Sequence, residues 1–221
     1  VPDRGGGSRM EGAARRIVAA VVVFGVVATG VAGAQTVADA EEGTDVEIQV
    51  DENGDSVWTV TTTVRLESDD EVQAFEEMDS QAAAEETVSR FRRFANRAEN
   101  QTGREMSVEL TSSEKEHENG VGIVIVGLDC DGFGTVDEEG DGVYIDDFFK
   151  GGLSLEEGQT VRIQGPEGYA VGASNVSEAE VNDTSVRWDG LVEVEKDVSV
   201  VFEKTRRTRR RAAKVYPALP S

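Results

Sequence analysis

Residues 44–66 read TDVEIQVDENGDSVWTVTTTVRL, and this stretch decides the fold class. Apolar and polar residues alternate on both sides of Asn53-Gly54. The apolar members of the alternation are Val46, Ile48, Val50, Trp58, Val60, Val64 and Leu66. A period of two predicts half-buried strands, and Asn-Gly supplies the positive φ that a tight hairpin turn requires. The stretch therefore predicts an antiparallel hairpin.

The next segment, residues 69–101, changes to apolar spacings of three and four, which predicts an amphipathic helix. Asp69 and Asp70 are suited to cap it and to complement the positive end of its dipole. The polar DSQ at residues 79–81 predicts a break into two helices. Four arginines gather in its second half: Arg90, Arg92, Arg93 and Arg97. They are expected to complement the helix dipole and pair with acids, and an anion-binding site is the alternative.

After Gly103 the pattern returns to short apolar or alternating runs, each of which predicts a strand. These runs lie at residues 105–110, 122–128, 143–149, 160–163, 169–171, 185–188 and 192–202. The run at 122–128 is wholly apolar, which favours a strand buried on both faces. Strands before and after one helical block predict an α+β domain with an antiparallel sheet of about 7–9 strands.

The segments outside this domain differ in composition. Residues 17–34, IVAAVVVFGVVATGVAGA, follow Arg15-Arg16 and end in small residues, which is typical of a signal peptide. A retained membrane anchor is the alternative interpretation of residues 1–34. The first nine residues are expected to come from an over-extended gene start. We expect a linker at 35–44, an exported domain at 45–203 and a disordered basic tail at 204–221.

The charge is unevenly distributed. Residues 35–202 carry 41 acidic and 11 basic residues, so their net charge is -30, whereas the whole chain has -22. Such an excess repels itself at low salt and is tolerated when salt is concentrated. We therefore expect the surface of a halophile. Nucleic-acid binding by the acidic domain is not expected, because phosphate would be repelled.

Clustered carboxylates make calcium the one cofactor to consider. The candidate ligands are Asp129, Asp131, Asp137, Glu139 and Asp141. An EF-hand is excluded, because the twelfth position counted from Asp137 is Phe148 and the flanks predict strands. The alternatives are an irregular calcium site and a solvated turn, and the turn is favoured; no other cofactor is expected.

Catalytic patterns are missing from the sequence. The single Cys and single His exclude a zinc cluster of cysteines. Cys130 would need a base, and His117 falls in EKEHENG, which predicts a mobile turn, so a structural or exposed thiol is expected. No GxSxG or phosphate-binding glycine pattern occurs. We therefore expect no enzyme. Three N-x-[ST] sequons, at Asn100, Asn175 and Asn182, are candidate glycosylation sites.

Four motifs occur in a characteristic order: IQVDENGDSVWTV, FRRFANRAENQTGREM, GPEGYAV and VRWDG. In these motifs the chain resembles a haloarchaeal family of exported domains of unknown function, over about Asp45 to Glu203. The resemblance implies a domain that precedes a transmembrane helix and a cytoplasmic winged-helix regulator. Its motifs are structural, so it implies no catalytic residues.

These observations lead to three hypotheses of function. The first is a non-enzymatic extracytoplasmic sensor or ligand-interaction domain, in a form truncated from a membrane-linked regulator. The second is a stand-alone structural module of the cell surface, and the third is a secreted enzyme. The expected partner is a ligand or envelope component, with a membrane contact if the N-terminal segment is uncleaved. The Arg-rich tail is expected to be a frameshift product or, alternatively, a genuine basic arm.

Overall fold

The computed structural model describes residues 42–151, 153–194 and 197–205. This part of the chain forms 13 β-strands in three sheets, two α-helices and one short 3-10 helix. The predicted α+β class is confirmed. More strands are present than predicted. Three of them, Thr135–Val136, Leu153–Leu155 and Glu180–Val181, have only two or three residues, too few for a periodic pattern, and the run predicted at 192–202 is divided into two strands.

Several predictions fall beyond this part of the chain. The signal peptide or anchor at residues 1–34, nearly all of the linker and the basic tail from residue 206 onward lie outside the described residues. Among the residues that are described, no helix is both long and apolar enough to cross a membrane.

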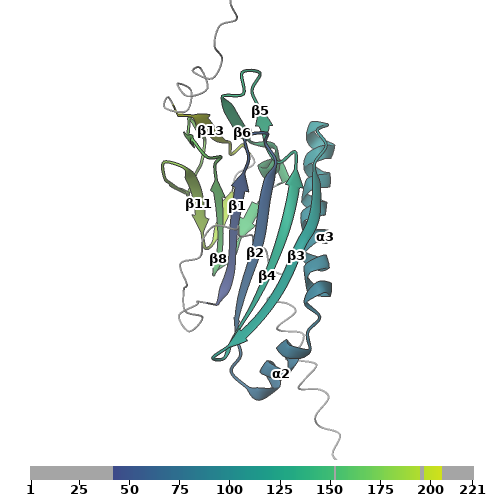
Figure 1. Ribbon diagram of the computed structural model, residues 1–221. Coiled ribbons are helices and arrows are strands. Elements are labelled where there is room, and N and C mark those ends of the chain that lie inside the picture. Colours follow the sequence, from purple (N-terminus) through teal and green to yellow (C-terminus); the bar gives the residue numbers. More distant parts are fainter. Residues whose placement is uncertain (1–41, 152, 195–196, 206–221) are drawn as a thin grey trace, which may run out of the picture.

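The largest sheet has seven strands in the order β10-β11-β8-β1-β2-β4-β3, seen side by side in Figure 1. Its strands are β1 (Gly43–Val50), β2 (Ser56–Arg65), β3 (Ser107–Glu118), β4 (Val121–Asp131), β8 (Gln159–Gln164), β10 (Glu180–Val181) and β11 (Ser185–Asp189). All neighbours are antiparallel except β1 and β8, which run parallel. The parallel pair departs from the predicted antiparallel sheet, because alternation identifies a strand but not its partner or direction.

The predicted hairpin is present as β1 and β2, with Val50 paired to Ser56. Its loop differs from a two-residue turn. The Asp51 N–H donates to the Asp55 carbonyl at 2.9 Å, and the Gly54 N–H donates to the Asp51 carbonyl at 3.1 Å. Only Gly54 has a positive φ, of 87°, as in a type I turn followed by a left-handed glycine. Gly54, rather than the Asn-Gly pair, therefore sets the loop geometry.

Two helices follow the hairpin, as the polar break predicted: α2 (Asp69–Glu77) and α3 (Ser80–Thr102). The cap of α2 is Ser68, whose hydroxyl accepts from the Glu71 N–H at 3.3 Å. The prediction that Asp69 or Asp70 caps the helix was wrong, although both lie in its acidic first turn. Asp79 caps α3, and Gly103, with φ 73°, ends it.

The smaller sheets form the other strand-built part of the domain. One has the order β5-β6-β13-β9 and the other pairs β12 with β7. Their bounds are β5 (Thr135–Val136), β6 (Gly142–Ile145), β7 (Leu153–Leu155), β9 (Tyr169–Val171), β12 (Val192–Val194) and β13 (Val200–Lys204). The strand predicted at 143–149 ends early, because η2 (Asp147–Gly151) begins where the Asp146 carboxylate accepts the Asp147 N–H at 2.9 Å.

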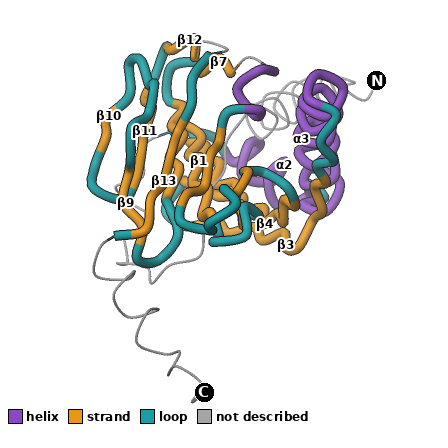
Figure 2. Tube along the Cα trace, turned by 90° about the horizontal axis from the view of Figure 1, so that it is seen from above, coloured by secondary structure: helices purple, strands orange, loops and turns teal. Residues whose placement is uncertain are grey.

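These elements share one hydrophobic core with the seven-stranded sheet. Trp58 of β2 lies at its centre and meets Phe91 of α3, Phe133 and Phe148 of η2 edge-on, at centroid distances of 5.0, 5.1 and 5.4 Å. Figure 2, turned by 90°, shows α2 and α3 gathered beside β3 and β4. Trp188 and Tyr169 are also fully buried, so all three are core residues.

Candidate functional site

The two faces of the seven-stranded sheet differ in what they contact. Side chains of one face, such as Ile48, Trp58 and Leu128, belong to the hydrophobic core. Val57, Ile123 and Ile125 alternate to the opposite face and belong neither to the core cluster nor to the apolar residues packed against it. We call this opposite side the open face.

The centre of the open face is a strip of β-branched side chains on β2 and β4. The register places Thr61 opposite Ile125 and Thr63 opposite Ile123. Ile123, Ile125 and Thr61 are half-buried, although they do not reach the core. The prediction that the strand at 122–128 is buried on both faces is therefore wrong, since its odd-numbered isoleucines remain partly accessible.

Charged side chains flank the strip on both sides. On β8 and β11, Arg162 binds Glu47 of β1 at 2.5 Å, and Arg187 binds Asp189 at 2.7 Å. On the other side, Glu114 of β3 lies opposite Ile125 and Glu116 lies opposite Ile123. An apolar centre with a charged margin is the usual anatomy of a protein-binding surface.

The predicted calcium ligands lie in two places. Asp129 and Asp131 are exposed at the end of β4, where Asp131 accepts the Ser107 hydroxyl at 2.9 Å. Asp137, Glu139 and Asp141 lie in the β5–β6 hairpin. Among the described residues, no three His, Cys, Asp or Glu side chains are grouped to hold a metal. An irregular calcium site therefore stays the alternative to the favoured solvated turn.

Asp137 has a structural role in that hairpin. Its carboxylate accepts the Asp141 N–H at 2.9 Å, and its carbonyl accepts the Gly140 N–H at 3.0 Å. The hydrogen bond from Asp141, with others from the backbone of the same turn, lowers the pKa of this partly exposed carboxyl. The acidic turn is thus ordered by its own backbone.

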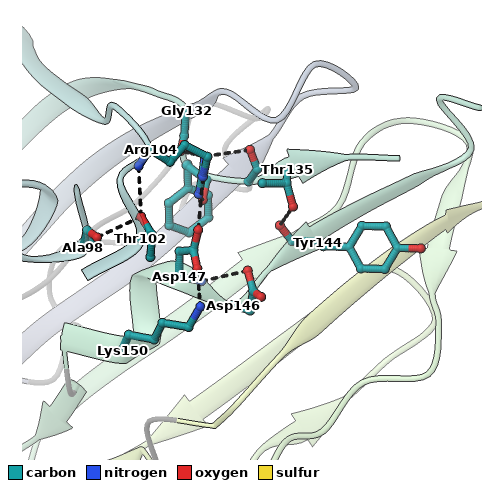
Figure 3. A network of polar contacts seen from close by, with 11 residues as sticks. Ala98, Thr102, Arg104, Gly132, Thr135, Tyr144, Asp146, Asp147 and Lys150 are labelled. Carbon is teal, nitrogen blue, oxygen red and sulfur yellow. Dashed lines mark hydrogen bonds and ion pairs between the residues drawn. The ribbon is translucent and has the colours of Figure 1, made fainter. Parts of the chain in front are cut away.

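A partly buried polar network joins the segment after α3, η2 and the loop after β4 (Figure 3). Nε of Arg104 donates to Asp147 at 3.1 Å, and its other nitrogens donate to the carbonyls of Gly132, Phe133 and Gly134. Lys150 donates to the second Asp147 oxygen at 2.5 Å. Burial acts to raise the pKa of Asp147, but the hydrogen bonds and charges of Lys150 and Arg104 outweigh it and lower that pKa. Both Asp147 oxygens accept hydrogen bonds from protein donors, so the network serves as a structural clamp.

The residues considered for nucleophilic catalysis are not brought together. Cys130 is buried on the core face of β4, and burial raises the pKa of its thiol to about 12. His117 lies in β3 rather than in the predicted mobile turn, with Nδ1 3.8 Å from Glu76 of α2. A thiol with so high a pKa is a poor nucleophile, which agrees with the structural role expected for Cys130.

The arginines of α3 make separate contacts. Arg90 pairs with Glu86 at 3.3 Å, Arg92 donates to the Val108 carbonyl at 2.9 Å, and Arg97 covers the Phe94 ring at 4.3 Å. Pairing with an acid is therefore confirmed for Arg90. Arg92 instead ties α3 to β3, a contact that helical spacing does not reveal.

The three sequons lie in different local structures. Asn100 is in the last turn of α3, Asn175 follows β9, and Asn182 is in the turn between β10 and β11. The open face itself was missed by the sequence interpretation. Its only signal in the sequence was the apolar residues at odd-numbered positions of β2 and β4. The same pattern is expected for a strand that is buried on both faces, so it does not identify an open face.

Comparison with known families gives one match. A family model described as a domain of unknown function (DUF7345) matches residues 47–169. The match begins within β1, includes β2 to β4 and ends at Tyr169, so the VRWDG motif lies outside it. No curated protein matches the chain.

Proposed function

The chain belongs to the DUF7345 family, a domain of unknown function, and we propose that it is a non-enzymatic interaction domain that binds a protein partner on its open face. The observation that carries this proposal is the strip of Val57, Ile123 and Ile125, which the core leaves uncovered. Side chains of this type normally complete a core, so their position on an open sheet favours a second protein as the covering layer.

The energetics favour a protein partner. Full burial of a Val or Ile side chain contributes about 1.5–3 kcal/mol. The three side chains of the strip are already half-buried, so each can contribute roughly 1 kcal/mol more when covered. The neighbouring Thr61, which is also half-buried, adds surface that packs without leaving a buried charge.

The charged residues that flank the strip indicate which chemistry the partner should have. Glu114 and Glu116 border the strip along β3, and Asp45 lies opposite Thr61 on β1. Arg162 and Arg187 already pair with Glu47 and Asp189, and Arg65 lies at the far end of the same face of β2, opposite Val121. A partner segment that carries apolar side chains flanked by Lys or Arg would complement this arrangement.

The place of action is part of the same proposal. The apolar segment at 17–34 supports export, and the net charge of -30 over residues 35–202 (41 acidic, 11 basic) supports a halophilic, haloarchaeal source. We propose an extracytoplasmic sensor that passes a binding event to a membrane-linked regulator. A stand-alone envelope module would use the same face without that link.

The test uses a basic peptide as the probe. A synthetic peptide with the sequence of residues 206–221 carries six basic residues followed by VYPAL. We expect it to shift the backbone amide NMR signals of β2 and β4. Glu114→Lys, on the margin, should weaken binding at least tenfold, and Ile123→Ser should weaken it about fivefold, because a buried isoleucine contributes about 1 kcal/mol.

The matched control is Glu85→Lys, which makes the same charge change on an exposed position of α3. It should alter the affinity less than twofold. Equal weakening by the two lysine variants, or signal changes confined to α3, would show that the peptide is attracted only by overall charge and would overturn the proposal.

A further inference from the structure

The three sequons are equivalent in sequence but not in structure. N-glycosylation needs an accessible Asn amide nitrogen and an accessible hydroxyl two residues later, presented by a surface loop. The acceptor amide must also be free to leave its local hydrogen bonds. These requirements can be checked for each sequon.

Asn100 does not meet them. Its amide donates to the Asn96 carbonyl at 2.5 Å within α3. The hydroxyl of Thr102 donates to the Ala98 carbonyl at 2.9 Å and accepts the Arg104 N–H at 3.3 Å. Presenting this sequon would require unwinding the last turn of α3, next to the Arg104 clamp.

Asn175 is also held in place. Its amide donates to the Asp197 carbonyl at 3.1 Å, and its backbone exchanges two hydrogen bonds with Ser199, at 2.9 and 3.0 Å. Ser177 is half-buried, and its carbonyl accepts the Trp188 indole N–H at 3.0 Å. Both ends of this sequon are therefore held by hydrogen bonds to other segments of the domain.

Asn182 is presented differently. Asn182, Asp183 and Thr184 are all exposed, in the turn between β10 and β11. The backbone is ordered, since the Asn182 N–H donates to the Ser185 carbonyl at 2.8 Å and the Thr184 carbonyl accepts the Gly165 N–H at 2.9 Å. The turn thus projects both reactive side chains from a fixed backbone.

From these contrasts we propose that Asn182 is the N-glycosylation acceptor of the folded domain, and that Asn100 and Asn175 are not. The co-reactant is a lipid phosphate-linked oligosaccharide. The Asn182 amide nitrogen forms a bond to C1 of the first sugar, the bond from C1 to the phosphate oxygen breaks, the lipid phosphate leaves, and the amide loses one proton. The proposal rests on the export that belongs to the proposed function.

A glycan at this position would also protect an edge of the sheet. β10 is its outermost strand, and Val181, next to the acceptor, is 48% exposed. An uncovered edge strand with an apolar side chain invites pairing with another chain. The opposite edge, β3, carries its own charged residues and a bulge.

The experiment treats the folded full-length chain with a purified single-subunit oligosaccharyltransferase and its lipid-linked oligosaccharide, and reads each site by glycopeptide mass spectrometry. Short peptides that contain the individual sequons are the unfolded controls. We expect occupancy of Asn182 to exceed that of the other two sites at least tenfold in the folded chain, and the three peptides to differ less than threefold.

Matched variants complete the test. Asn182→Gln should remove the glycan from the folded chain, whereas Asn100→Gln and Asn175→Gln should leave its amount unchanged. Equal occupancy of Asn100 or Asn175 in the folded chain, or an unmodified Asn182 whose peptide is modified, overturns the proposal. Peptide binding to the open face is measured on the unglycosylated chain, so either proposal can fail without the other.

Discussion

On strand β4, Leu128 and Val126 point into the core, whereas Ile125 and Ile123 point to the open face. The same comparison holds on β2, where Trp58 is enclosed by aromatic rings and Val57 is not. Both faces use β-branched or large apolar residues, so composition does not distinguish them. The second layer of α3, η2 and the smaller sheets makes the difference, because it covers one face only.

This comparison separates stability from recognition. Substitutions on the core face should act on the free energy of unfolding. Substitutions on the open face should change it little and act on binding instead. Five measurements test that division.

The largest difference is expected in thiol reactivity. Cys130 lies on the core face, and burial raises its pKa to about 12, so little thiolate exists at pH 8. We expect iodoacetamide to modify it at least about a thousandfold more slowly than a new thiol made by Thr61→Cys on the open face. Intact mass spectrometry over time gives both rates. Similar rates would mean that β4 is open to solvent on both faces.

The second difference is in packing. Leu128→Ala removes a fully buried side chain and should lower the free energy of unfolding by about 3 kcal/mol. Ile125→Ala, three residues earlier on the same strand, should lower it by about 1 kcal/mol or less, since no cavity forms at an open face. Denaturant titration at a fixed high salt concentration measures both. An equal loss would place Ile125 under an additional layer.

The alternation of residues 44–66 predicted the hairpin and its inward side chains, because a period of two fixes which side chains share a face. The change to spacings of three and four predicted the helical block that follows. The extent of β3 could not be predicted. Inward-pointing Lys115 there donates to the carbonyls of Phe75, Glu76 and Met78 at the end of α2, at 2.8–3.1 Å. From the sequence alone, a charged residue at an inward position favours a turn over a strand. The carbonyls that accept its hydrogen bonds are 37–40 residues away, so the local pattern does not reveal them.

The open face was unpredictable for a related reason. Which face of a sheet is covered depends on where the later strands and η2 pack, and that information lies outside the strand itself. The clamp residues Arg104 and Asp147, 43 residues apart, likewise carry no local signal. The two-helix break and the end of α3 were predictable because Asp79 and Gly103 act within one turn.

The third prediction compares an ion pair in the layer that covers the core face with an ion pair on the open face. Asp147→Asn breaks the buried clamp and should lower the free energy of unfolding by roughly 2 kcal/mol, below the value for a fully buried pair because Lys150 is partly exposed. Glu47→Gln, in the exposed pair with Arg162, should lower it by about 0.5 kcal/mol. Denaturant titration at pH 7 measures both.

The clamp also has a predicted pH dependence. The pKa of Asp147 is lower in the folded protein than its ordinary value of about 3.9. Its contribution is therefore complete above that value and is lost as the pH falls through the folded pKa. The difference between the native chain and Asp147→Asn should shrink below about pH 4. A constant difference down to pH 2 would contradict the assigned role.

The smallest effect concerns two neighbouring threonines of β2. Thr62 points into the core, is 2% exposed, and its hydroxyl has no hydrogen-bond partner among the described residues. Replacing that hydroxyl by a methyl group removes an unsatisfied polar atom while keeping the shape of the side chain. Thr62→Val should therefore raise the free energy of unfolding by about 1 kcal/mol, whereas Thr61→Val on the open face should leave it nearly unchanged. The unfolding midpoints of the two variants in denaturant titrations test this prediction. Destabilisation by Thr62→Val would mean that the core face holds a polar partner for the Thr62 hydroxyl. The division between an apolar core face and an open face would then fail at the centre of the sheet.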